Sequence, residues 1–250
     1  MTHQLQPESN ANNILERIFN YISGGLEIEL FSKLRLTREI DAIDDLEPKL
    51  VLKGLMSYAL GDFDLGEEYI RRATYNYGIT PFIAINHVNA IKLLGHYKLA
   101  ESYLNQYIES LSPIMLIEAL NEACTYHDFK QINHILSKLE PMETALEQFK
   151  VQIEGAKEKA EFISSFSEQN NISECTIYKY FDITIKTLEQ CKLVYLGSGI
   201  NSYESEGLDI YFKVDYSVED VISLNERLID NLLESDFYNT CISTRFRPSN

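Results

Sequence analysis

The chain has 250 residues, of which 45% are hydrophobic and 24% charged, so it can form one large domain or two small ones. This balance excludes a disordered chain, a collagen and a disulfide-knotted miniprotein. The 38 acidic residues outnumber the 22 basic ones and give a net charge of −16. A field of that sign repels phosphate and disfavours duplex nucleic acid and anionic membranes as partners.

The N-terminus and the cysteines favour a cytoplasmic protein. No basic start followed by an apolar run is present, so no signal peptide is predicted. The longest uncharged stretch, residues 75–91, contains polar groups that hydrocarbon would penalise, so no membrane span is predicted. No CxxC pair occurs, which argues for free thiols and against a zinc or redox motif. The four cysteines are Cys124, Cys175, Cys191 and Cys241.

Residues 10–35 predict two helices, broken at Gly24-Gly25, that cap the segment after them. Their apolar stripes contain Ile14, Ile18 and Ile22, then Ile28, Phe31 and Leu34. Five acidic residues follow within positions 39–47, a run that predicts a solvated linker.

Four of the six prolines are spaced at intervals of 33, 32 and 28 residues: Pro48, Pro81, Pro113 and Pro141. Two of them follow a residue that favours helix N-caps, in Thr80-Pro81 and Ser112-Pro113. Because proline already has a helical φ and needs no donor at the first helical position, we predict helices that begin near these four prolines. The last of them is expected to continue over residues 142–169.

A turn signal recurs between the predicted helix starts. Three turn residues are each followed two positions later by an aromatic residue, in Gly61/Phe63, Gly95/Tyr97 and His127/Phe129. Glycine ends a helix readily in the left-handed conformation, and the aromatic ring can wedge between the two helices. An apolar helical pattern follows each turn. The sequence therefore predicts a unit of helix, three-residue turn and helix with a period near 34 residues.

This unit resembles the tetratricopeptide repeat (TPR) family over residues 48–140. The first copy carries the family's small, turn, aromatic, small and small residues as Gly54, Gly61, Phe63, Gly66 and Ala73. The second copy departs at Val88 and Tyr107, and the third keeps only Phe129. The resemblance implies a mainly α fold of stacked helical hairpins in a right-handed solenoid. The alternative is an irregular helical bundle.

The resemblance also implies a binding groove, because the first helix of each hairpin lines the concave surface. Asn86 and Asn89 share a helix face and could bond to an extended peptide, and Lys92 could meet a carboxylate. Val51 and Leu55 replace the carboxylate clamp of some family members, so an apolar or mixed ligand is expected. The implied groove residues are Val51, Leu55, Tyr58, Ile85, Asn86, Asn89, Lys92, Ile117, Asn121 and Cys124.

Residues 172–250 predict a separate, small α+β domain, which leaves residues 1–171 as the helical domain. We expect a helix through residues 177–188, strands at 193–196 and 208–216, a helix at 218–234 capped by Ser217, and a last strand at 241–246. Gly197-Ser198-Gly199 lacks both the dinucleotide fingerprint and the hydrolase elbow, so it predicts a turn or bulge.

No catalytic, cofactor or metal site is predicted. His127, Asp128 and His134 lack a third ligand at helical spacing, and Glu204, Glu206 and Asp209 do not form a calcium loop. His87 and His96 are expected at the surface or in the groove. Arg245 and Arg247 form the one close basic pair of the tail, for which a solvated terminus is preferred over an anion site.

Three functions stay open. The first, which we favour, is a non-enzymatic adaptor or regulator that binds a peptide or protein segment in the helical groove, with charge favouring a basic partner. The second is an acidic inhibitor, chaperone or neutralising partner of a basic nucleic-acid-binding effector. The third is an enzyme with a site in the C-terminal segment, near Ser198 or Glu204. An edge strand or the last hairpin would also allow a homodimer.

Overall fold

The computed structural model describes residues 8–25, 28–125, 128–203, 207–235 and 239–249. It is mainly helical with a small three-stranded sheet near the C-terminus, as the sequence predicts. The chain forms two compact units, residues 1–111 and 112–250, rather than units divided at 171/172. The reason is that helices after residue 112 pack on the C-terminal segment, for example through Phe129 and Phe181, whose rings lie 5.9 Å apart.

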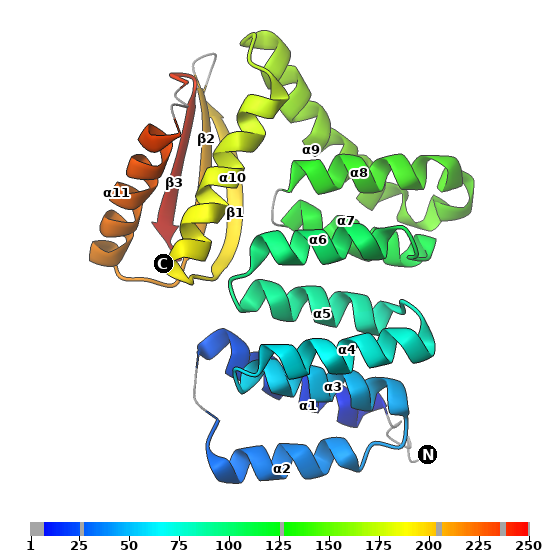
Figure 1. Cartoon of the computed structure of the whole chain (residues 1–250). Coiled ribbons are helices and arrows are strands. Elements are labelled where there is room, and N and C mark those ends of the chain that lie inside the picture. The colour runs from blue at the N-terminus through cyan, green and yellow to red at the C-terminus, as the bar shows by residue number, and fades with distance from the viewer. Residues whose placement is uncertain (1–7, 26–27, 126–127, 204–206, 236–238, 250) are drawn as a thin grey trace, which may run out of the picture. The chain divides into compact units, whose positions relative to one another are not determined.

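The N-terminal unit consists of helices alone in its described residues. They are α1 (Glu8–Gly24), α2 (Leu30–Asp41), α3 (Leu46–Ala59), α4 (Phe63–Tyr77), α5 (Pro81–Leu93) and α6 (Tyr97–Ile108). Figure 1 shows α3/α4 and α5/α6 as two successive antiparallel hairpins. The predicted helix starts near residues 48 and 81 are confirmed.

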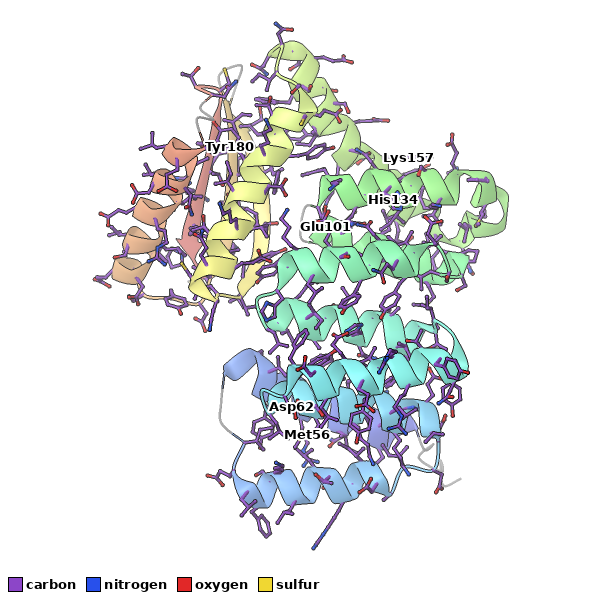
Figure 2. The ribbon with its side chains drawn as sticks, viewed as in Figure 1. Met56, Asp62, Glu101, His134, Lys157 and Tyr180 are labelled. Carbon is purple, nitrogen blue, oxygen red and sulfur yellow. The ribbon has the colours of Figure 1, made fainter. Side chains whose placement is uncertain are left out.

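The two predicted glycine turns of this unit are also confirmed. Gly61 and Gly95 both have φ +79°, a conformation that side chains with a Cβ rarely adopt. Asp62, labelled in Figure 2, follows the first turn and caps α4 by accepting a hydrogen bond from the Leu65 N–H at 3.2 Å. The third predicted turn residue, His127, lies outside the described residues.

Small residues let α3 and α4 approach closely. A Cβ on Gly54 would lie 3.1 Å from the carbonyl oxygen of Gly66, and a Cβ on Gly66 would lie 2.3 Å from the ring of Tyr58. The Tyr58 ring in turn lies 5.2 Å from the ring of Phe63, the aromatic residue of the turn. Glycine at positions 54 and 66 is thus required by the packing of the hairpin.

The first two helices cover α3, but α2 does so with a different face from the one predicted. The stripe of α1 is buried as expected, at Ile14, Ile18 and Ile22. In α2 the buried residues are Leu36 and Ile40, whereas Phe31 and Leu34 are exposed. The prediction of a buried stripe through Phe31 and Leu34 is wrong, because α2 begins only at Leu30 and turns those residues away from α3.

The acidic run at residues 39–47 is structured rather than a simple linker. Glu39 pairs with Arg17 of α1 and with Arg35 of its own helix. Asp41 pairs with Lys53 of α3 at 2.7 Å. Asp45 caps α3. These contacts tie α1, α2 and α3 together at the end of α2.

The C-terminal unit is α+β. Its elements are α7 (Pro113–Thr125), α8 (Phe129–Leu139), the 3₁₀ segment η1 (Glu140–Phe149), α9 (Lys150–Gln169), α10 (Glu174–Cys191), β1 (Tyr195–Tyr203), β2 (Gly207–Val214), α11 (Val218–Glu234) and β3 (Ile242–Pro248). Ser217 caps α11 as predicted. The helix predicted over residues 142–169 is confirmed from Lys150 onward, as α9, but its first part is wrong, because Glu140–Phe149 is a 3₁₀ segment with a kink at Leu146.

The sheet has the order β1-β2-β3, with β1 antiparallel and β3 parallel to β2. Residues 197–199 lie inside β1, so a turn at this position is wrong. The register irregularity between Tyr195 and Gly197 agrees with the other prediction, a bulge. Helices α10 and α11 cover one face, through a hydrogen bond between the hydroxyls of Thr184 and Thr244 and one from the Asn225 amide to the Phe246 carbonyl. Tyr180 of α10 (Figure 2) accepts a hydrogen bond from the Asn239 N–H just before β3.

We expect Gly66→Ala to lower the free energy of unfolding of the N-terminal unit by about 1–3 kcal/mol, because the added methyl group would overlap the Tyr58 ring. Gly155→Ala is the control: the same atom meets nothing within 4 Å in α9, and alanine should raise stability by about 0.5–1 kcal/mol. Hydrogen exchange on each variant measures both changes. An unchanged protection of α3 and α4 in Gly66→Ala would contradict the close approach.

Candidate functional site

The groove implied by the repeat is closed in its first hairpin. Helix α3 packs against α1, α2, α4 and α5, and eight of its fourteen residues are buried. Val51 and Leu55 have no exposed surface and Tyr58 is 1% exposed. The prediction that these three residues face a ligand is wrong, because the chain's own helices occupy all sides of α3.

The other implied groove residues divide by exposure. Ile117 of α7 is buried as well, and Asn86 is buried with its amide donating to the Phe82 carbonyl of its own helix at 2.7 Å. Ile85, Asn89, Lys92 and Cys124 are half-buried and Asn121 is exposed. The described structure therefore does not present these residues as one continuous ligand surface.

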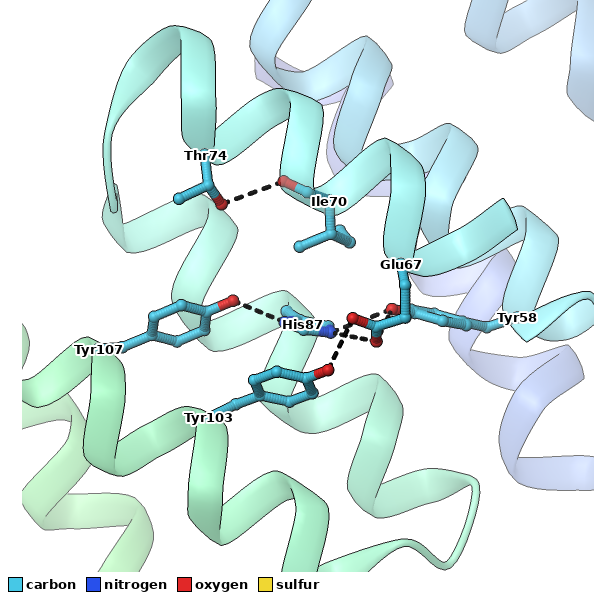
Figure 3. A network of polar contacts seen from close by, with 7 residues as sticks. All are labelled: Tyr58, Glu67, Ile70, Thr74, His87, Tyr103 and Tyr107. Atoms are coloured by element: carbon cyan, nitrogen blue, oxygen red, sulfur yellow. Dashed lines mark hydrogen bonds and ion pairs between the residues drawn. The ribbon is translucent and has the colours of Figure 1, made fainter. Parts of the chain in front are cut away.

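A polar cluster occupies the interior of the two hairpins instead. Figure 3 shows Glu67 of α4 surrounded by Tyr58 of α3, His87 of α5, and Tyr103 and Tyr107 of α6. Tyr58 donates to Oε1 of Glu67 at 2.6 Å, and Tyr103 donates to Oε2 at 2.7 Å. His87 Nε2 lies 3.1 Å from Oε1, and His87 Nδ1 lies 2.7 Å from the Tyr107 hydroxyl. One carboxylate thus links three neighbouring helices to α4.

The contacts assign the proton of the His87 ring. Nε2 faces a carboxylate oxygen, which only accepts, so Nε2 carries the hydrogen and donates to Glu67. When the ring is neutral, Nδ1 accepts from the Tyr107 hydroxyl. In this arrangement every polar atom of the cluster that points inward has a partner of the right kind. His87 is therefore an interior residue, and its predicted place at the surface or in the groove is wrong.

Burial and contacts within the cluster shift the pKa values of its members. Burial opposes ionisation of Glu67, but hydrogen bonds from His87, Tyr58 and Tyr103 outweigh it and lower the pKa of Glu67 to about 2. Burial together with the charge of Glu67 raises the pKa of Tyr58, Tyr103 and Tyr107. Glu67 is thus a stable anion whose hydrogen-bonding capacity is used by the protein itself. This arrangement is suited to holding helices together and not to proton transfer.

The two described candidate site residues of the C-terminal unit, Ser198 and Asp209, lie in the sheet. Asp209 accepts hydrogen bonds from Ser243, Arg245 and Arg247, so it is not available as a cation ligand. Glu204 and Glu206 lie outside the described residues. Ser198 lies within β1 opposite Phe212. Among the described residues, no group of three or more histidine, cysteine or acidic side chains is placed to hold a metal ion.

Helix α11 presents a second apolar face. The sequence predicts an apolar stripe through Val221, Leu224, Leu228 and Leu232, of which the first three are buried and Leu232 is half-buried. Four further aliphatic residues are 54–65% exposed: Val218, Ile222, Ile229 and Leu233. At 3.6 residues per turn these four fall within about 60° of one another, so they form one strip along the helix. We call this strip the α11 stripe.

Acidic residues border the α11 stripe. Helix α11 carries five acidic residues and a single basic one, Arg227. The helical spacing of Glu219, Glu226 and Asp230 aligns them along one side of the stripe. An exposed apolar strip with a charged border is typical of a surface that binds another protein.

Two other surface features, an apolar patch on α2 and a hollow in the C-terminal unit, give weaker support for a binding site. Leu30, Phe31 and Leu34 form a smaller exposed apolar patch on α2. In the C-terminal unit a hollow of about 410 Å³ is lined by Phe129, Gly155, Glu158, Lys159, Phe162 and Ile200. The Lys159 amine is directed to the Cys124 carbonyl at 2.9 Å, so the hollow's one cation is already bound.

No protein-family model, no curated protein and no solved structure matches the chain. The resemblance to the TPR family stays a prediction from the sequence. Within the part of the chain that is described, none of the helices combines the length and apolar character needed to cross a bilayer.

We expect Glu67→Gln to lower the free energy of unfolding at pH 7 by about 2–3 kcal/mol, because the amide NH₂ would face groups that donate. Glu68→Gln is the matched control on the same helix: Glu68 is half-exposed, its Arg72 ion pair is 3.9 Å long, and we expect less than about 0.5 kcal/mol. Urea unfolding followed by circular dichroism measures both. Equal effects of the two variants would contradict the role of the cluster.

Glu67 also makes the free energy of unfolding depend on pH. The folded pKa of Glu67, about 2, is below its unfolded value, so its contribution is complete above the unfolded pKa and is lost as the pH falls towards 2. The stability difference between wild type and Glu67→Gln should therefore shrink between about pH 5 and 2. Unfolding free energies measured across this range test it; a difference that grows on acidification would contradict the assignment.

Proposed function

We propose that the protein is a non-enzymatic interaction protein whose α11 stripe binds an amphipathic segment of a partner protein. The observation that carries the proposal is the exposure of four aliphatic side chains on one face of α11. Leaving such a strip in water is unfavourable at roughly 25 cal/mol per Å², and a partner's apolar face would remove that cost. The surface differs from the repeat groove, but the class of function is the adaptor or regulator favoured by the sequence.

The border of the stripe supports a basic partner. Acidic side chains line one side of it, and the chain as a whole has a net charge of −16. Lysine or arginine residues flanking the partner's apolar face would be attracted, whereas a second copy of α11 would bring like charges together. We therefore propose a helix with an apolar face and basic flanks. The four unpaired cysteines are in keeping with a reducing compartment such as the cytoplasm.

The test is a titration with a synthetic 18-residue helix that has leucine on one face and lysine on the other. We expect the double variant Ile222→Glu/Ile229→Glu to bind this peptide about tenfold or more weakly than wild type, because it loses apolar contact. The substitution adds negative charge, so binding by charge alone would become tighter. Fluorescence anisotropy of the labelled peptide distinguishes the two results.

Val151→Glu is the matched control, since Val151 is 80% exposed on α9 and lies outside the α11 stripe. It should bind the peptide like wild type. Phe31→Glu tests the α2 patch in the same way. Loss of binding in Phe31→Glu with retention in the α11 double variant would assign the interaction to α2 and overturn the proposal.

A further inference from the structure

Helix α2 has an apolar face on each side. Figure 1 shows it at one end of the N-terminal unit, where it packs on α1 and α3 and buries Leu36 and Ile40. On the far side Leu30, Phe31 and Leu34 are 72%, 79% and 50% exposed. At 3.6 residues per turn these three fall within about 100° of one another and form the α2 patch.

Basic residues border the α2 patch. Arg38 lies about one turn beyond Leu34 on the same side of the helix, and Lys33 lies at the other border. Both are exposed, and neither forms an ion pair in the described part of the chain. Glu29, one turn before Lys33, offsets part of its charge, but it is nine residues from Arg38, about 13 Å along the helix axis. Arg38 is therefore the main cation available at this surface.

The two acidic residues of α2 itself do not neutralise Arg38, because other bases already bind them. Glu39 accepts from Arg35 at 2.8 Å and also pairs with an arginine of α1. Asp41 is bound by Lys53 of α3 at 2.7 Å. Helix α2 thus combines an exposed apolar face with a basic border, which is the chemistry proposed for the segment that binds the α11 stripe.

We propose that the α2 patch of one copy of the chain binds the α11 stripe of a second copy, an inference that rests on the proposed function of that stripe. The acids beside the stripe suit Arg38, because Glu226 and Asp230 are exposed and form no ion pair among the described residues. One contact of this kind removes two exposed apolar surfaces from water and places opposite charges side by side.

The helical spacing selects an antiparallel orientation. Viewed from the N-terminus of each helix, the acids lie clockwise of the α11 stripe, and Arg38 lies clockwise of the two leucines of the α2 patch. Two helices that face each other bring their clockwise borders to the same side only when they run in opposite directions. This orientation gives three pairs: Leu30 with Leu233, Leu34 with Ile229, and Arg38 with Glu226.

The expected association is weak. Two copies with a net charge of −16 repel one another at long range, and one helix against one helix buries less than a standard interface. We therefore expect a dissociation constant of about 10–100 µM. Each copy carries both surfaces, so the contact joins unlike patches and allows further copies to add.

The test is analytical ultracentrifugation of the full chain at about 5–300 µM, a range that spans the expected dissociation constant. The average mass of wild type should rise with concentration. Phe31→Glu, which blocks the α2 patch, and Ile222→Glu/Ile229→Glu, which blocks the α11 stripe, should each weaken self-association about tenfold or more. Val151→Glu, exposed on α9 outside both surfaces, should associate like wild type.

Mixing the two blocked proteins is the decisive step. Phe31→Glu retains an intact α11 stripe and the α11 double variant retains an intact α2 patch, so an equimolar mixture should form a one-to-one complex. A mixture that stays monomeric would overturn the proposal. So would self-association of the α11 double variant alone, which indicates pairing of two α2 patches, or of Phe31→Glu alone, which indicates pairing of two stripes.

A charge exchange repeats the test without altering the apolar residues. Arg38→Glu and Glu226→Arg should each weaken self-association, and their mixture should restore it, because every contact then joins opposite charges. Equal masses for these variants and wild type would contradict the antiparallel pairing. Wild type that stays monomeric while its α11 stripe binds the synthetic peptide would overturn this inference and leave the proposed function in place.

Discussion

The carboxylate of Glu67 is the interaction on which the N-terminal unit depends. It receives hydrogen bonds from Tyr58, His87 and Tyr103, which belong to three different helices, and His87 extends the cluster to Tyr107. An ionised carboxylate inside a protein is costly unless it is fully bonded, so a shift of any one helix would leave a charge without its partners. Apolar packing brings the hairpins together, and this cluster selects one register between them.

A second carboxylate, Asp209, is 2% exposed and has a comparable role between two strands. Around Glu67 the donors are interior tyrosine hydroxyls and a histidine, so the cluster closes on itself. Around Asp209 the donors are Arg245 and Arg247, which reach solvent, and the Ser243 hydroxyl. The same chemistry therefore holds four helices together in one unit and the strands β2 and β3 together in the other.

Local signals in the sequence predict local structure well. Thr80-Pro81 and Ser217 mark helix starts, and Gly61 and Gly95 mark turns, because caps and left-handed turns are set by a few adjacent residues. Which face of a helix meets solvent is not local. The sequence of α3 is apolar on several sides, and only the packing of four other helices shows that Val51 and Leu55 belong to the interior.

Neither the exposed face of α11 nor the contacts of Arg245 and Arg247 could be predicted from the sequence, for related reasons. The apolar residues of α11 cover a wide arc of the helix. The sequence alone does not show which of them face the core and which face solvent, because that division depends on where the sheet packs. From the sequence, a solvated terminus is preferred for Arg245 and Arg247. Only the parallel pairing of β2 with β3 brings them near Asp209 and Lys213, some thirty-five residues earlier in the chain. Long-range strand pairing is not encoded in any short window of sequence.

Asn225 joins α11 to the sheet. It lies on α11 near the stripe, and its amide forms two hydrogen bonds with the backbone of Phe246, at 2.7 Å to the N–H and 3.1 Å to the carbonyl. Phe246 stands between Arg245 and Arg247 on β3, so the position of α11 and the position of both arginines are fixed by the same residue. The α11 stripe therefore lies on a helix whose position on the sheet is held by these two hydrogen bonds.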